Sequence, residues 1–288
     1  MSTPEIEKNL YSSSSFITAY SLFSYSPFFR NIILCVNNII KDFKMVNFRQ
    51  LKGTGNFYFV RHGQSIANTK KVIQGHLNSK LSELGEKQAV QTGRWFKDKN
   101  IHTVLTSPLD RARRTAELIA GEAGCSTVEV LPNLIEFNTG VFSGFSLEEA
   151  REKYPEDYRN FYLYSWEGVR GAENPRKIYN RALKHWQYLF KLFSTGSTNT
   201  VSVSHAGFIQ WLIKTTFGHR EWLPLFPMTN CGLFHFALDN SVASLRMDKA
   251  EKRVSETTGS LAKEETEIYT YKYGWKLINY HVGESAPT

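Results

Sequence analysis

Short apolar runs alternate with longer amphipathic stretches through most of this chain. Each run holds four to eight residues rich in β-branched and aromatic side chains, which is typical of strands buried on both faces of a sheet. The sequence predicts strands at residues 57–60, 103–106, 127–131, 200–204 and 231–238. Residues 249–267 are charged and predict a surface excursion, and residues 267–280 predict additional edge strands.

The stretches between the runs carry apolar residues at helical spacing. Ser82 is a suitable N-cap for a helix that extends to about Lys99, and a second helix is expected after Ser107-Pro108. Further helices are expected over 176–193 and directly after Gly207. Strands that alternate with helices predict an α/β fold, a three-layer α/β/α sandwich with a mostly parallel central sheet.

The first 54 residues differ in character from the rest. Four consecutive serines begin at Ser12, and an apolar helical stripe follows over residues 29–43. No apolar run approaches the roughly 18 residues of a transmembrane helix. Three interpretations stay open for this extension: a poorly ordered segment with Met45 as an alternative start, a helix docked on the domain, or a membrane-surface or targeting helix. Residues 55–284 are expected to form one domain.

Charge and cysteine content narrow the classes of ligand and compartment. The formal net charge is +8, which favours anionic ligands. Because the basic residues are scattered and no nucleic-acid-binding motif accompanies them, a small phosphorylated substrate is expected rather than nucleic acid. The three cysteines lack Cys-x-x-Cys spacing, so neither a disulfide framework nor a zinc site is expected and a cytoplasmic location fits best.

Charged and imidazole side chains follow the predicted strands at the points where they end. Arg61 and His62 follow the first strand, Arg111 lies in the first helical turn after the second, Glu136 follows the third and His205 ends the fourth. The carboxyl ends of parallel strands meet at one edge of a sheet, where ligands bind. We therefore expect these five side chains to converge, although gathering charged groups is costly unless a ligand satisfies them.

Two arginines, two histidines and a carboxylate suit phosphoryl transfer. Guanidinium groups bind phosphate oxygens through forked hydrogen bonds, and one imidazole can attack phosphorus to form a covalent intermediate. The other imidazole can donate to a non-bridging oxygen, while the carboxyl protonates the departing alcohol. The sequence shows no paired-carboxylate or His-x-x-His spacing, so neither a metal nor another cofactor is expected.

Five motifs in this order resemble the histidine phosphatase superfamily, which has the phosphoglycerate-mutase-like fold, over roughly residues 56–282. They read RHGQSIAN, IQG, TSPLDRARRTA, LIEFNTGVFSG and VSVSHAG. The resemblance implies that His62 is the phosphorylated nucleophile and Glu136 the proton donor. It places His205 with them in the catalytic set. Further phosphate or substrate contacts are implied for Arg61, Asn68, Gln74, Gly75 and Arg111.

The choice between members of the family depends on a few positions. Relatives that are mutases usually have Thr-Gly where this chain has Gln74-Gly75, and a longer basic segment where residues 137–145 are short and aromatic. A metal-independent phosphomonoesterase is therefore expected, with phosphoglycerate mutase and a non-catalytic binding protein as alternatives. Ser143 and Asn78 replace the more usual Glu and Asp, which affects the expected substrate more than the activity.

Specificity is expected to come from a cap over residues 148–175. Lys153, Arg159 and Arg170 are candidates for meeting a second phosphate. Four nearby aromatic residues are instead suited to an apolar leaving group: Phe142, Phe145, Phe161 and Trp166. A sugar phosphate, a nucleotide, a cofactor precursor and a phosphoprotein all stay open as substrates, as do homo-oligomerisation and membrane association of the N-terminal segment.

Overall fold

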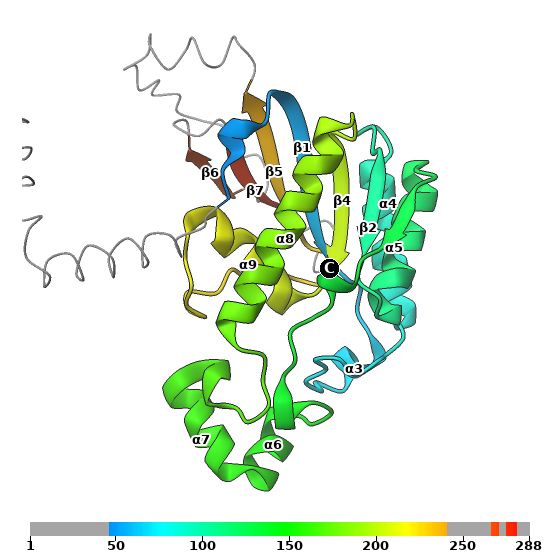
Figure 1. The fold of residues 1–288 in the computed structure, drawn as a ribbon. Helices are drawn as coiled ribbons and strands as arrows, with labels where there is room; N and C mark the ends of the chain where they lie inside the picture. Colours follow the sequence, from blue (N-terminus) through cyan, green and yellow to red (C-terminus); the bar gives the residue numbers. More distant parts are fainter. Residues whose placement is uncertain (1–45, 241–265, 271–274, 281–288) are drawn as a thin grey trace, which may run out of the picture. The chain divides into compact units, whose positions relative to one another are not determined.

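The structure, a computed structural model, describes residues 46–240, 266–270 and 275–280. These form a seven-stranded sheet in the order β3-β2-β4-β1-β5-β7-β6 (Figure 1). The strands are β1 Gly53–Arg61, β2 Thr103–Thr106, β3 Val128–Val130, β4 Asn199–Ser204, β5 Leu233–Asn240, β6 Thr266–Thr270 and β7 Trp275–Tyr280. The predictions for the N-terminal stripe and for residues 249–265 lie outside the described residues.

The sheet is mostly parallel, as predicted. β1 pairs in parallel with β4, β4 with β2, and β2 with β3, whereas β5, β7 and β6 each pair antiparallel with the strand before them in the sheet. As a result, only β5 and β6 run against the direction of β1. The expectation of edge strands at residues 267–280 is correct for β6 and wrong for β7, which lies between β5 and β6.

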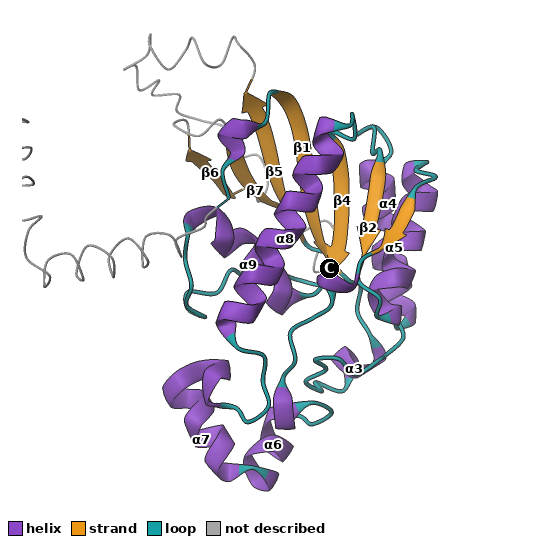
Figure 2. Ribbon diagram, viewed as in Figure 1, coloured by secondary structure: helices purple, strands orange, loops and turns teal. Residues whose placement is uncertain are grey.

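Helices cover both faces of the sheet, which confirms the three-layer arrangement (Figures 1 and 2). α8 and α9 pack on one face, and α4 and α5 on the other. Ser82 caps α4 as expected by accepting a hydrogen bond from Gly85 N, 3.1 Å away. The α-helices are α3 Ile66–Thr69, α4 Glu83–Phe96, α5 Asp110–Ala123, α6 Leu147–Lys153, α7 Pro155–Tyr164, α8 Pro175–Ser194 and α9 Ala206–Phe217.

Alternating side chains of β1 supply both halves of the hydrophobic core. Phe57 and Phe59 point toward α8, where their rings lie 5.6 and 5.1 Å from the Trp186 ring. Tyr58 and Val60 belong to the opposite core with α4 and α5. Each fully buried side chain of this size contributes about 1.5–3 kcal/mol, so the strand that precedes Arg61 is firmly anchored.

The domain's packing begins before residue 55, where the sequence placed its boundary. Val46, Phe48 and Leu51 are buried in the same core as Phe57, and the Phe48 ring lies 5.0 Å from that of Trp186. Phe48 belongs to η1, a short 3₁₀ helix at Phe48–Gln50. Residues 46–54 therefore belong with the domain rather than with the N-terminal extension.

A small helical cap, α6 with α7, follows η3, a short 3₁₀ helix at Gly140–Phe142. Figure 1 shows both helices beyond the edge of the sheet to which the arrowheads of β2 and β4 point. A capping box between Ser146 and Glu149 starts α6, and Pro155 occupies the first turn of α7. The cap has its own small core around Phe142, Ala150 and Val169.

Two further findings concern the described residues as a whole. Cys125 and Cys231 are buried and not joined in a disulfide. In the part of the chain that the structure describes, no helix combines the length and apolar character needed to cross a bilayer.

Candidate active site

The register of three strands brings the first group of site residues together. Arg61 of β1 lies opposite Ser204 of β4, and Thr106 of β2 lies opposite Val203. The main chain continues these ladders by one residue, because His62 N donates to Ser204 O at 2.9 Å and Ser107 N to Val203 O at 3.0 Å. The rings of His62 and His205 consequently lie 5.1 Å apart, centroid to centroid.

His62 is buried, and its two ring nitrogens have different environments. Nδ1 lies 2.7 Å from Gly63 O, which can only accept, so Nδ1 carries the proton. Nε2 then has a lone pair, and it accepts a hydrogen bond from Arg111 Nε at 3.2 Å. Burial lowers the pKa of His62 well below its usual value, and the positive charges of Arg111 and Arg61 lower it further. The ring is therefore a neutral imidazole with an unprotonated Nε2.

Gly63 is needed because α4 packs closely against the turn after β1. A Cβ at this position would lie 2.4 Å from Gly85 O, in the first turn of α4. The missing side chain thus lets α4 approach the turn after β1 closely. Gly63 N also donates to Thr115 Oγ1 of α5 at 3.0 Å, so both helices hold the segment that carries His62.

His205 is fully buried and is fixed by Ser107, which the sequence indicated only as the residue before a helix and not as a site residue. Its Nε2 lies 2.7 Å from Ser107 Oγ, which also accepts a hydrogen bond from Leu109 N. With its acceptor side used in this way, the serine hydroxyl is suited to donate to Nε2, which leaves the proton on Nδ1. Nδ1 is buried and has no hydrogen-bond partner among the described residues. Burial lowers the pKa of His205 well below its usual value, with Arg111 adding to the effect.

The two arginines are each held by backbone carbonyl groups. Arg111, 1% exposed, donates to Leu77 O at 2.7 Å and to Gly75 O at 3.0 Å. Its burial lowers its pKa to about 10, which still leaves it charged at neutral pH. Arg61 donates from Nη1 to Met228 O at 2.7 Å, and its Nε is buried with no partner among the described residues. A buried N–H of this kind is costly until it meets an acceptor.

Glu136 lies at the first turn of α9, beyond η2 at Pro132–Leu134. Its Oε1 accepts from Phe208 N at 2.8 Å and from Phe137 N at 3.0 Å, and its Oε2 accepts from Gly207 N at 3.1 Å. The carboxylate thus occupies the position where a helix N-terminus favours negative charge. Burial raises the pKa of Glu136, although these backbone donors and Arg111 oppose the rise.

The remaining residues predicted to contact phosphate or substrate lie in α3 and in the loop between α3 and α4. Asn68 Oδ1 accepts from Ser65 N at 3.1 Å in a capping box of α3, and Gln74 Oε1 accepts from Ser65 Oγ at 3.0 Å. Gly75 has a φ of +48° and binds Arg111 through its carbonyl. Gln74 and Gly75 lie in the loop that holds Arg111, whereas Asn68 lies in α3. The described contacts of all three residues are with protein groups.

The two departures from the family pattern help to shape this loop. Ser143 Oγ donates to Gln74 O at 3.0 Å. Asn78 Oδ1 accepts from Asp110 N at 2.9 Å, so it caps α5, whose own N-cap residue Leu109 makes no side-chain bond. Both substitutions therefore act next to Gly75 and Arg111 without contacting His62.

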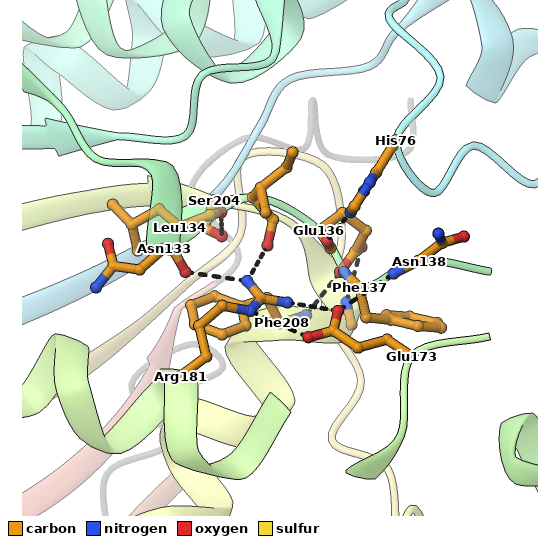
Figure 3. A network of polar contacts seen from close by, with 12 residues as sticks. His76, Asn133, Leu134, Glu136, Phe137, Asn138, Glu173, Arg181, Ser204 and Phe208 are labelled. Atoms are coloured by element: carbon orange, nitrogen blue, oxygen red, sulfur yellow. Dashed lines mark hydrogen bonds and ion pairs between the residues drawn. The ribbon is translucent and has the colours of Figure 1, made fainter. Parts of the chain in front are cut away.

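A second polar cluster, which the sequence also missed, surrounds the segment before Glu136. Arg181 of α8 donates to Asn133 O at 3.0 Å and to Ile135 O at 2.5 Å, and it pairs with Glu173 at 2.9 Å (Figure 3).

Within the described residues, no group of three or more histidine, cysteine or acidic side chains is arranged to hold a metal ion.

Comparison with known proteins identifies the class. Residues 57–248, more than half of the chain, match the family model of the histidine phosphatase superfamily, branch 1. The chain therefore belongs to the histidine phosphatase superfamily. Members of this superfamily are phosphatases or mutases, so membership supports phosphoryl-transfer catalysis by this chain.

The chain is similar to particular members of both kinds. It is 46% identical over 91 residues to the protein named "Probable phosphoglycerate mutase GpmB" of Erwinia tasmaniensis, covering 32% of this chain and 42% of that one. The protein of the same name from Escherichia fergusonii is 30% identical over 165 residues, covering 57% of this chain and 76% of the other. In structure, the chain resembles the alpha-ribazole phosphatase of Shigella flexneri, with a TM-score of 0.57, 22% identity and coverage of 64% and 91%.

Proposed function

We propose that this protein is a metal-independent phosphomonoester hydrolase that works through a phosphohistidine at His62. The proposal rests on the protonation and the hydrogen bonds of the His62 ring. His62 is buried and neutral, its Nδ1–H is held by Gly63 O, and its Nε2 lone pair lies beside the Arg111 guanidinium. A nucleophile for phosphorus needs that lone pair, and the attacked phosphate needs that cation.

The proposed reaction has two balanced steps. Nε2 of His62 forms a bond to phosphorus as the bond between phosphorus and the ester oxygen breaks, and the Glu136 carboxyl gives its proton to the leaving alkoxide. Water then attacks the phosphohistidine, the Glu136 carboxylate takes the water's proton, and the nitrogen–phosphorus bond breaks to return neutral His62. Arg61 and Arg111 neutralise the phosphoryl oxygens, and His205 donates Nδ1–H to one of them.

Hydrolysis is proposed rather than isomerisation because two of the three basic cap residues named as candidates for a second acidic group are already engaged by protein groups. Arg170 is engaged by Asp157, at 2.9 Å to the carboxylate, and Lys153 lies over the Phe145 ring at 4.3 Å. The aromatic residues of the loop do not supply basic groups, and Phe142 is fully buried within the cap. The substrate proposed is a small phosphorylated metabolite, and a cytoplasmic location remains the prediction from cysteine usage.

Phosphoglycerate mutase is the second candidate, because the relatives from Erwinia and Escherichia carry that name. The two functions share every step up to the phosphohistidine. They differ in whether water or a second hydroxyl receives the phosphoryl group. The name of a relative therefore does not choose between them, and the acceptor has to be measured.

A generic aryl phosphate assayed with excess chelator tests the proposal. We expect turnover that releases inorganic phosphate, that the chelator leaves unchanged, and that His62→Ala abolishes. Acid-labile phosphate on the quenched wild-type enzyme would identify the intermediate. Full activity in His62→Ala would refute the mechanism. Isomerisation of phosphoglycerate that depends on a bisphosphorylated primer and outpaces hydrolysis would favour the mutase.

A further inference from the structure

The main-chain segment that leads to Glu136 is fastened by side chains from three other parts of the fold. Arg181 of α8 donates to the carbonyl oxygens of Asn133 and Ile135. Ser204, at the end of β4, donates to Leu134 O at 2.6 Å. His76 Nε2 lies 2.8 Å from Glu136 O. Four consecutive carbonyl groups, from residue 133 to residue 136, are therefore each bound by a side chain.

Arg181 makes the most contacts with this segment and its neighbours, because all three nitrogens of its guanidinium donate hydrogen bonds. Nη1 binds both loop carbonyls, while Nε and Nη2 bind the two oxygens of Glu173 at 3.3 and 2.9 Å. The pair is largely shielded from water, with the side chains 16% and 17% exposed. Glu173 also accepts from Asn138 N at 3.3 Å, so the pair holds the chain on both sides of Glu136.

The same guanidinium also contacts Phe208, a residue in the first turn of α9 whose N–H binds the Glu136 carboxylate. Its central carbon lies 4.1 Å from the centre of the Phe208 ring, and Phe208 N is the closest donor to the Glu136 carboxylate. Figure 3 shows the dashed contacts of Arg181 with the loop before Glu136 and with Glu173. Only a planar fork with several fixed donors can meet two carbonyls and a carboxylate at once, and the ammonium group of lysine lacks that geometry.

We propose that Arg181, together with Glu173, is a positioning residue that aims the Glu136 carboxyl at the leaving-group oxygen. This inference rests on the proposed function, in which Glu136 is the general acid. A carboxyl displaced by about 1 Å loses on the order of 100-fold in rate, because proton transfer requires a short hydrogen bond to the leaving group. Arg181 makes none of the hydrogen bonds that hold His62, so the nucleophile keeps its own contacts when Arg181 is changed. The charge of Arg181 also lowers the pKa of His205, an effect that acts on both substrates alike.

The experiment uses the leaving group as the readout. When an aryl phosphate of an acidic phenol is cleaved, the phenolate departs without being protonated. When an alkyl phosphate such as glycerol 2-phosphate is cleaved, the departing alkoxide needs a proton from the general acid. For each variant, kcat/KM is measured on both substrates with one enzyme preparation. Their ratio is independent of how much of the preparation is folded, so a loss of stability in a variant does not disturb it.

Arg181→Lys is expected to raise the aryl-to-alkyl ratio by about 10- to 100-fold, and Glu173→Gln to raise it less. Glu136→Gln should raise it by about 10²- to 10⁴-fold, the usual contribution of a general acid. Lys184→Met, at an exposed position of α8, is the matched control and should leave the ratio unchanged.

The outcomes distinguish a failure of the positioning role of Arg181 from a failure of the acid role of Glu136. If Arg181→Lys lowers both rates equally while Glu136→Gln shifts the ratio, Arg181 is only structural and the inference is wrong. If Glu136→Gln itself leaves the ratio at the wild-type value, the acid role in the proposed function fails. A shift in both variants, with the control unchanged, supports positioning.

Discussion

Gly207→Ala is a small change that should separate activity from stability. Gly207 is in the first turn of α9, and its N–H binds Glu136 Oε2. A Cβ added there would lie 2.3 Å from Phe137 Cε1 and 2.8 Å from Glu136 Oε1. Separations this short force the neighbours to move, and the neighbours are the proposed acid and the ring beside it.

The stability cost is limited by a compensating term. Overpacking of this kind costs about 1–3 kcal/mol, whereas alanine is favoured over glycine within a helix by about 0.8–1.0 kcal/mol. The free energy of unfolding should therefore fall by no more than about 2 kcal/mol. Activity has no such compensation. A carboxyl displaced by about 1 Å lowers kcat/KM on an alkyl phosphate by on the order of 100-fold.

The assay pairs kcat/KM on an alkyl phosphate with unfolding in urea. Gly121→Ala in α5 is the matched control, because a Cβ at Gly121 meets no atom within 4 Å. It should stabilise the protein by about 0.5–1 kcal/mol and leave activity unchanged. Wild-type activity of Gly207→Ala on the alkyl phosphate would refute the placement of the acid at the start of α9.

Two further predictions concern pH. On an alkyl phosphate, kcat/KM should fall as pH drops through the lowered pKa of His62, because the nucleophile must be neutral. It should also fall as pH rises through the raised pKa of Glu136, because the acid must be protonated, and Glu136→Gln should remove this alkaline limb. An unchanged alkaline limb in that variant would exclude Glu136 as its source. His185 is fully buried, its Nε2 lies 2.9 Å from Ser202 Oγ, and burial lowers its pKa from 6.5 to about 3. Because the unfolded chain then binds the extra proton, stability falls as pH drops below about 6.5, by about 1.4 kcal/mol per pH unit from this residue. His185→Gln should flatten the urea-unfolding free energy against pH by that slope, and parallel slopes would contradict the assignment.

The strands and the ends that carry chemistry are predictable from the sequence because a buried strand is an apolar run with an abrupt polar end. The predicted 103–106 and 200–204 runs match β2 and β4 to within a residue. A shift of one residue in a strand boundary does not move His62 or His205 away from the sheet edge. The gathering of the polar residues at one edge therefore follows from topology and needs no knowledge of side-chain contacts.

The cap and the fastening of the Glu136 segment were not predictable in the same way. The aromatic residues around α7 obscure its helical period, although the capping box at Ser146 and the proline at Pro155 were available as start signals. Arg181 occupies a polar position of an amphipathic helix, as Arg176 does. Nothing local distinguishes them, since the partners of Arg181 are carbonyls and a carboxylate brought together only by folding.

Burial also decides whether the proposed acid and nucleophile can coexist in their working forms. In the proposed mechanism His62 must be neutral while Glu136 is protonated. With ordinary pKa values of 6.5 for histidine and 4.5 for glutamate, the two requirements conflict. At pH 6.5, where half of the histidine is neutral, only about 1% of the carboxyl is protonated. Desolvation disfavours whichever form is charged, so the same loss of water lowers the pKa of the imidazole and raises that of the carboxyl. The arginines reinforce the shift of His62 but Arg111 opposes that of Glu136, so the acid depends on burial alone. Burial therefore moves both pKa values in the direction that favours the two working forms, and the arginines add to the shift only for His62.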